Sequence, residues 1–400
     1  LGIVSSLGEG VAAHWAALNE PILAPVVDET SFAPYPVHPL ADIDFSTQIA
    51  RKGDLRQMGQ WQRIGVYAAG QALQDAGIAG QRDLLDKTDL IVAAGNGERD
   101  EAADANILRE LAGVGDGAAS LGAILNHELQ TRIRPTHYLA ELSNLLAGNI
   151  SIVHGVAGSS RTFKGEEMAG VSAVEDAVRR ISSRQGQLFL VGGAFNAERA
   201  DLSVVFELCD ALWRRPYQPV YQRSAMDGGF IMGSLGVFLV LESDAHALAR
   251  GKSPYARITS IASGSTGRSS HDDTGRRDEN FLLDDLVSQL QDGPLGVLSG
   301  ASGVEPATGR ERKWISRLGE RGVLPVVRAY GTMLGHSVEA QFPAGVALAA
   351  LAISKGAFYP PFETTGQEQP LQGSVDHILV TGWGHWRGEG IALVETASFQ

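Results

Sequence analysis

The sequence predicts an α/β protein built in layers from two similar halves. Strand and helix signals alternate along all 400 residues, which favours sheets covered by helices. Forty-eight glycines lie mainly between short apolar runs, as tight turns between such elements require. A weak internal echo indicates duplication, because residues 189–193 followed by 236–242 resemble residues 378–382 followed by 390–395.

Individual elements can be placed in order along the chain. The opening residues read like the end of a strand, so we expect the natural N-terminus to lie a few residues earlier. Residues 57–76 are expected to form a helix and residues 90–97 a buried strand that runs into a glycine loop. Small-residue helices at 169–181 and 343–354 precede the echoed strand pairs. We place the boundary near residues 249–252, which gives an N-terminal half of residues 1–250 and a C-terminal half of residues 251–400.

Composition excludes several classes of function. The net charge of −13 argues against general binding of nucleic acid, which depends on basic surface. There is no apolar stretch of the length that a membrane span needs, and no secretory signal. Cys209 is the single cysteine, so neither an internal disulfide nor a cysteine metal cluster is expected. These features favour the cytoplasm, and no motif predicts a cofactor or a metal.

The most informative position is Glu167, which lies in a Lys-Gly-Glu-Glu-Met-Ala-Gly segment at the start of a predicted helix. A hydrophobic strand that ends in Gly-Gly follows at residues 188–194. This order resembles the β-ketoacyl synthase family of the thiolase fold, whose elbow residue is a cysteine that carries the acyl chain as a thioester. A carboxylate is a poorer nucleophile than a thiolate, and its acyl adduct would be a hydrolysable anhydride. The chain therefore resembles a ketosynthase that has lost its nucleophile.

Further segments resemble the same family across most of the chain. Residues 6–18 are similar to its opening Pro-Leu-Gly and tryptophan helix, and residues 217–233 to its Arg-Asp-Gly-Phe passage. Residues 237–251 follow the family's pattern of a strand that ends in glutamate and a helix that ends in Ala-Arg-Gly. Just before them the chain departs from the family, because Ser234 replaces the glutamate of the Gly-Glu-Gly motif. The resemblance implies a five-layered α-β-α-β-α thiolase fold with two similar halves.

The catalytic positions that the resemblance implies are degenerate. Active members use the cysteine, two histidines and a lysine, and the histidines bind the thioester oxygen. The first histidine loop here reads Ser-Gly-Ala-Ser-Gly around Ala301, the lysine position falls on Gly331, and only the second histidine is present, as His336. The family's flexible Gly-Phe-Gly-Gly gate is replaced here by a different segment near the C-terminus. Its residues Trp383, His385 and Trp386 are candidates for lining the tunnel or its gate. Met168, which lies beside the elbow, is a further candidate.

The catalytic residues are lost while the surrounding family segments are kept. This combination resembles the chain-length factors of type II polyketide systems, in which the elbow residue is usually glutamine. The resemblance implies a non-catalytic subunit that pairs with a cysteine-bearing ketosynthase, helps to form the acyl tunnel and works with acyl carrier protein. Aryl-polyene pathways contain a more divergent factor of the same kind.

Alternatives stay open at this point. Glu167 is either a structural anion stabilised at a helix N-terminus, a residue that shapes the tunnel, or part of a decarboxylating site. His336 is either a buried histidine with satisfied hydrogen bonds or a residue that faces a ligand. The whole chain is alternatively a homodimeric condensing or malonyl-decarboxylating enzyme that uses Glu167 and His336, or a scaffold that binds acyl carrier protein.

Other motifs favour structural interpretations. Cys209 falls on the apolar face of an amphipathic helix with residues 202, 205, 206 and 213, so we expect a core cysteine. Residues 335–339 miss the Gly-x-Ser-x-Gly hydrolase elbow because Glu339 replaces the last glycine. The polar cluster at 271–273 is expected to be a solvated loop rather than a metal site. The arginine pairs 179–180 and 214–215 are expected to form surface ion pairs, with contact to an acidic carrier protein as the alternative.

Overall fold

The computed structural model describes residues 1–20, 22, 24–113, 118–132, 141–267, 295–371 and 373–397. In these residues the first sheet has six strands in the order β2-β1-β8-β6-β4-β5. Their bounds are Gly8–Glu9, Gly2–Ser5, Leu235–Glu242, Leu188–Phe195, Asp89–Ala94 and Ser160–Lys164. The second sheet has the order β11-β10-β12-β13-β9. Its bounds are Pro325–Ala329, Leu295–Ser299, His377–Trp383, Arg387–Glu395 and Arg257–Gly267.

The two sheets repeat one topology. In the first sheet β4 runs parallel to β5 and β6, while β8 is antiparallel to both β6 and β1. In the second sheet β10 runs parallel to β11 and β12, while β13 is antiparallel to both β12 and β9. The order β5-β4-β6-β8-β1 therefore matches β11-β10-β12-β13-β9, which is the physical origin of the echo in the sequence. We propose that the boundary between the two halves lies at residue 250.

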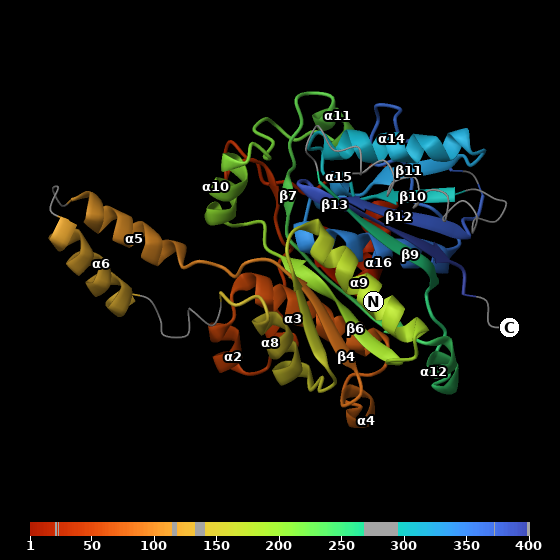
Figure 1. The fold of residues 1–400 in the computed structure, drawn as a ribbon, viewed down its shortest axis with the longest axis horizontal. Helices are drawn as coiled ribbons and strands as arrows, with labels where there is room; N and C mark the ends of the chain where they lie inside the picture. Colours follow the sequence, from red (N-terminus) through yellow and green to blue (C-terminus); the bar gives the residue numbers. More distant parts are fainter. Residues whose placement is uncertain are drawn as a thin grey trace.

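Helices form three layers around the two sheets (Figure 1). Helices α9 (Glu167–Ser182) and α16 (Gln341–Lys355) lie between the sheets and contact strands of both. Helices α3 (Gln60–Asp75) and α8 (Leu145–His154) cover the outer face of the first sheet, and α14 (Ala307–Glu320) covers the second. The five-layered thiolase fold implied by the sequence is confirmed.

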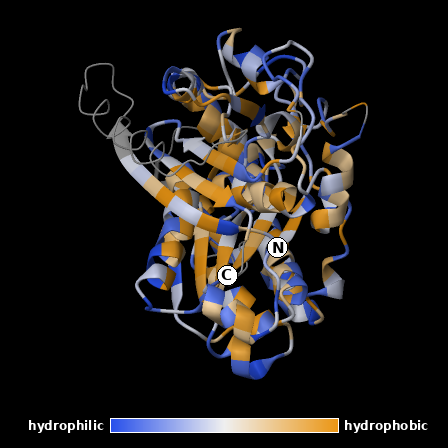
Figure 2. Ribbon diagram, turned by 90° about the vertical axis from the view of Figure 1, so that its right-hand side faces the viewer, coloured by the Kyte–Doolittle hydropathy of each residue, from blue (hydrophilic) through white to orange (hydrophobic). Residues whose placement is uncertain are grey.

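The apolar residues of the strands fill the spaces between these layers. The buried side chains of α16 run along almost its whole length, so this helix is hydrophobic on all sides, as a helix between two sheets must be. Figure 2 shows hydrophobic residues along the central strands and helices, with hydrophilic residues at the periphery. Two smaller clusters lie under α3 and under α14.

The remaining helices lie at the edges of this core or outside it. Helices α5 (Glu101–Ala112) and α6 (Ala118–Arg132) project away from the body beside α10 (Ala200–Leu208) (Figure 1). The short elements have these bounds: α1 Gly10–Leu18, α2 Lys52–Gln57, α4 Arg82–Leu85, α11 Val220–Ser224, α12 Asp244–Ala249, α15 Gly331–Leu334, β3 Val37–His38, β7 Met232–Gly233, η1 Phe45–Thr47 and η2 Val338–Ala340.

The helix predicted at residues 57–76 is wrong at its start. The chain forms α2 and α3 separately, with the extended residues Met58 and Gly59 between them. The Gln62 side chain accepts a hydrogen bond from the Gly59 N–H at 3.1 Å, which begins α3 after the break. Within the described residues, none of the helices is both long enough and apolar enough to cross a membrane.

Candidate functional site

Glu167 is the first residue of α9 and is buried, with 6% of its surface exposed. Glycine 165, in the turn that precedes it, has φ +154°. The turn connects β5 to α9 and brings the N-terminus of α9 to the carboxyl end of the first sheet's parallel strands, where α/β proteins place their sites. Free backbone N–H groups at this end of the helix favour a carboxylate.

His336 is the partner of Glu167. Its Nε2 lies 2.9 Å from Glu167 Oε1, and only 1% of the His336 surface is exposed. The backbone of His336 pairs with the β7 segment, because its N–H donates to Ile231 O at 2.8 Å and its carbonyl accepts from the Gly233 N–H at 3.1 Å. The ring of Phe230 packs against the imidazole with centroids 5.1 Å apart. Glu167, at the elbow position, and His336, the one catalytic residue that is kept, therefore form a buried pair.

Two opposing effects set the pKa of Glu167. Burial raises it, but the hydrogen bond and charge of His336, with the backbone N–H groups of Glu167 and His385, outweigh burial and hold the pKa below its usual value. Glu167 is therefore an anion at neutral pH, held by the imidazole and the helix N-terminus.

Ala301 and Gly331 lie next to each other, as the resemblance implies for a histidine and a lysine of one site. A Cβ built on Gly331 would lie 3.2 Å from Ala301 O. Both residues are buried, and the nearby Gln341 side chain accepts a hydrogen bond from Ser337 N–H, directly after His336, at 2.8 Å. Neither Ala301 nor Gly331 carries a group that donates a proton or stabilises an oxyanion.

The gate candidates fall into two places. His385 and Trp386 form the β12–β13 turn above Glu167, and the Trp386 ring stacks on Phe206 with centroids 6.5 Å apart. Met168 packs under the same hairpin, where a Cβ on Gly388 would meet its Cγ at 2.4 Å.

Trp383 does not belong to this group. Its ring packs against Trp314 on the outer side of the second sheet, with centroids 5.4 Å apart. Successive strand side chains alternate between faces, and position 383 of β12 points toward α14. The prediction of Trp383 as a gate residue is wrong for this reason.

A cavity of about 380 Å³ lies beside the Glu167–His336 pair. Its lining includes the polar residues Glu166, Glu339 and Arg199 and the aromatic residues Phe206 and Trp386. Glu167 and His336 are not among the lining residues. The buried pair is thus adjacent to this cavity but not part of its lining.

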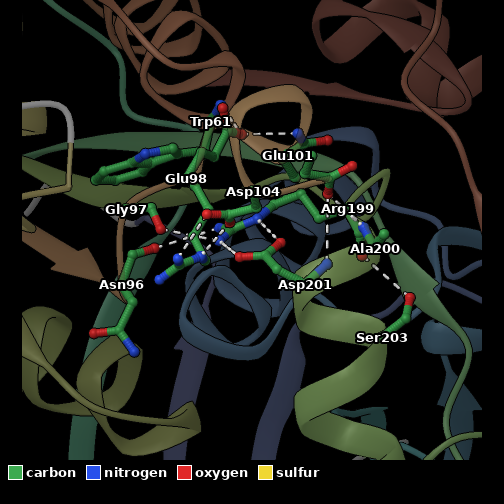
Figure 3. Close-up of polar contacts among 12 residues, drawn as sticks. Trp61, Asn96, Gly97, Glu98, Glu101, Asp104, Arg199, Ala200, Asp201 and Ser203 are labelled. Carbon is green, nitrogen blue, oxygen red and sulfur yellow. Dashed lines mark hydrogen bonds and ion pairs between the residues drawn. The ribbon is translucent and has the colours of Figure 1, made fainter. Parts of the chain in front are cut away.

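A polar network that sequence reasoning missed holds one wall of this cavity (Figure 3). Arg199 pairs with Asp201 at 2.5 Å and donates to Gly97 O at 2.9 Å. Glu98 accepts from Asn196 Nδ2 at 2.8 Å and from the Trp61 N–H at 2.8 Å, and thereby caps α3. The network joins three separate segments of the chain, at residues 61, 97–98 and 196–201, so only the fold brings them together.

Cys209 is not the core residue that the helical spacing predicts. Helix α10 ends at Leu208, and Cys209 is exposed. Val205 on the predicted apolar face is also exposed, while Phe206 is buried. The helix lies at the surface with one narrow buried stripe, which the spacing of apolar residues overestimates.

The other motifs have structural roles where they are described. Ser337 is buried and donates to Gly233 O at 2.9 Å, so it is not an exposed elbow serine. The predicted arginine ion pairs are confirmed at these contacts: Arg179–Glu175, Arg180–Asp89, Arg214–Asp210 and Arg215–Asp227. The polar cluster at 271–273 lies outside the described residues.

Comparison with known proteins identifies the class. The family described as "Beta-ketoacyl synthase, N-terminal domain" matches residues 37–247, more than half of the chain. The chain therefore belongs to the β-ketoacyl synthase family.

Relatives come from both fatty-acid and polyketide synthesis. The 3-oxoacyl-[acyl-carrier-protein] synthase 2 of Vibrio harveyi is 25% identical over 366 residues, which cover 84% of this chain and 80% of the relative. The oxytetracycline polyketide putative beta-ketoacyl synthase 1 of Streptomyces rimosus is 24% identical over 90% of this chain and 85% of its own.

Solved structures share the fold over the whole length. The ishigamide ketosynthase/chain length factor aligns with a TM-score of 0.76 at 22% identity, over 99% of this chain and 98% of its own. A beta-ketoacyl synthase from Burkholderia phymatum STM815 aligns with a TM-score of 0.77 at 19% identity and the same coverage.

Proposed function

We propose that this chain is a non-catalytic subunit of the chain-length-factor kind, which pairs with a cysteine-bearing β-ketoacyl synthase and shapes the acyl tunnel of a type II polyketide or polyene system. The observation that carries the proposal is the buried Glu167–His336 pair, which fills the place where a thiolate and its histidine would act. An acyl transfer needs a nucleophile that an incoming thioester can reach. Glu167 is a weak nucleophile, is buried and does not line the neighbouring cavity.

The side-chain donors that would stabilise a developing negative charge are missing as well. A stabilising group must point a free donor at the position of the developing charge. His336 Nε2 is already directed at Glu167, and Ala301 and Gly331 have no donor side chain. Decarboxylative condensation therefore falls to the partner subunit, with acyl carrier protein delivering its substrates.

An open sheet edge supports pairing with a second subunit. In the described residues β5 ends the first sheet, and Ser160, Arg161 and Lys164 are exposed. An unpaired strand edge of this kind is a template for another chain's strand. The similarity to the ketosynthase/chain length factor structure supports the choice of partner. The most specific part of the proposal is that the system to which this subunit belongs makes an aryl polyene.

Native mass spectrometry of the tagged chain from its natural host tests the proposal. A one-to-one pair with a different subunit of similar size that carries the elbow cysteine is the expected result. A homodimer that turns over malonyl-acyl carrier protein would overturn it.

A proline at position 162 tests the pairing edge directly. Leu90 N–H donates to Ser159 O at 2.8 Å, and Leu90 is in register with Ser160. Alternation along a parallel ladder then directs the Thr162 N–H to the outer edge. We expect Thr162→Pro to weaken the heterodimer at least about tenfold, because it removes a donor from that edge and leaves the bonds to β4 intact.

The matched control is Thr162→Val, which keeps the N–H and is expected to pair like the wild type. Circular dichroism of both variants reports whether each chain is folded, and dilution of the purified pair in native mass spectrometry measures its affinity. Equal affinity for Thr162→Pro and Thr162→Val would exclude β5 as the interface.

The 2.9 Å contact between a carboxylate and an imidazole also favours a second candidate, a homodimeric condensing or decarboxylating enzyme that uses Glu167 and His336. Malonyl-acyl carrier protein turnover by the isolated chain, lost in Glu167→Ala, would support this function. Absence of turnover in the isolated wild-type chain would eliminate it.

A further inference from the structure

The lining of the cavity beside α10 combines two kinds of side chain. Its apolar and aromatic part includes Leu202, Val205, Phe206, Val338 and Trp386. Its polar part contains both cationic and acidic side chains: Lys164, Arg199, Glu166 and Glu339, with the amides of Asn96 and Asn196. A volume of about 380 Å³ falls in the range of small-molecule sites, which combine apolar walls with a few fixed polar groups.

Glu339 is the most constrained of the polar groups. Only 7% of its surface is exposed, and it follows Val338, whose φ is +43°. Its carboxyl rests against Gly95, where a Cβ would lie 2.4 Å from Oε1, so only glycine at position 95 leaves room for it. The turn and the glycine together hold the carboxyl at the wall of the cavity.

The neighbouring basic side chains are directed elsewhere. Arg199 is paired with Asp201 and bound to Gly97 O. Arg387 lies 3.3 Å from Glu166, and His336 is paired with Glu167. In the described part of the chain, Glu339 forms no ion pair and no hydrogen bond with another side chain.

This environment keeps the Glu339 carboxyl neutral at pH 7. Burial and the charges of Glu167 and Glu166 raise its pKa to about 8, against the lowering effects of its own backbone N–H and of Arg199. A neutral carboxyl group donates a hydrogen bond through its O–H. An anionic ligand group would meet the charge of Glu166, while a cationic group would meet Arg199 and Lys164. A neutral oxygen acceptor avoids both conflicts.

We infer that this cavity binds a hydrocarbon chain that carries a neutral oxygen group, and that Glu339 selects for that oxygen by hydrogen bonding to it. The apolar wall of Phe206 and Trp386 takes the hydrocarbon, and the Glu339 carboxyl takes a ketone or hydroxyl oxygen. The acyl nature of the ligand rests on the proposed function, whereas the selection by Glu339 rests on the cavity itself.

Two thioether probes that cannot acylate a partner cysteine test the inference: S-octyl and S-(7-oxooctyl) N-acetylcysteamine. Their binding to the full chain, with its partner subunit if one co-purifies, is followed by tryptophan fluorescence, since Trp61 and Trp386 line the cavity. We expect the ketone probe to bind about tenfold more tightly, as one hydrogen bond to a buried carboxyl predicts. Glu339→Leu is expected to abolish this preference and keep the binding of the octyl probe, while Glu339→Gln keeps a donor and most of the preference.

The pH dependence in the wild type gives a measurement that needs no variant. The O–H donor is present below the pKa of Glu339 and is lost as the pH rises past about 8, so the preference for the ketone probe declines above that pH. Equal binding of the two probes at pH 7, or a full preference in Glu339→Leu, would overturn the inference. Tighter binding of an S-(8-aminooctyl) probe would instead define a cation site and overturn it too. Binding is measured separately from subunit pairing, so failure here leaves the proposed function intact.

Discussion

Replacement of Gly233 by alanine is expected to lower the free energy of unfolding by about 3 kcal/mol, near the upper end of the cost of overpacking. A Cβ on Gly233 would lie 1.9 Å from Leu334 O and 2.9 Å from Gly335 Cα, and these are backbone atoms that cannot rotate away. The strand β7 would have to separate from the loop that holds His336, which breaks the 3.1 Å hydrogen bond from Gly233 N–H to His336 O. Urea denaturation followed by circular dichroism measures the loss.

The matched control is Gly53→Ala in α2. A Cβ at Gly53 meets nothing within 4 Å, and alanine is the better helix former, so we expect no loss of stability. If Gly233→Ala unfolds at the same urea concentration as Gly53→Ala, the close packing of β7 against the His336 loop is wrong.

The sequence predicts the framework of the fold well, because the framework depends on local periodicity. The strands at 188–195 and 377–383 and the central helices appear where apolar runs and small residues place them. The break between α2 and α3 is missed, since the capping by Gln62 is a contact that hydrophobic spacing does not contain.

The candidate site is predicted only in part. Glu167 and His336 are both singled out by the family resemblance, but their 2.9 Å contact across 169 residues is brought about by the fold. The sequence marks Glu339 only as the residue that replaces the last glycine of a Gly-x-Ser-x-Gly motif. Its role at the cavity cannot be predicted from this, because its burial depends on Gly95 in a different loop. Cys209 and Trp383 are misplaced for a related reason: periodicity tells which residues share a face, but tertiary packing decides what that face contacts.

His336→Ala is expected to destabilise the chain by about 3 kcal/mol at pH 7, because it leaves the Glu167 carboxylate buried without its partner. Glu167→Gln is the matched control, since the amide keeps the size and hydrogen-bonding capacity of the side chain, and its cost is expected to stay below about 1.5 kcal/mol. In the double variant the cost is expected to be smaller than the sum of the two, as residues in direct contact couple. Urea denaturation of the wild type, the two single variants and the double variant measures this double-mutant cycle.

The pH dependence of the same cycle separates a charge effect from a packing effect. In the wild type the lowered pKa of Glu167 contributes stability that is fully present above the unfolded value of 4.5 and is lost as the pH falls through the lower, folded value. Without His336, burial raises the pKa of Glu167, so the carboxylate takes up a proton at a higher pH than in the wild type. The deficit of His336→Ala therefore shrinks as the pH falls through this raised value and on through the lowered value of the wild type. A deficit that stays constant with pH would mean that the imidazole only fills space. If the chain is the non-catalytic partner, Glu167→Gln also leaves the condensation rate of the assembled pair unchanged, because the pair stabilises the fold and takes no part in the reaction.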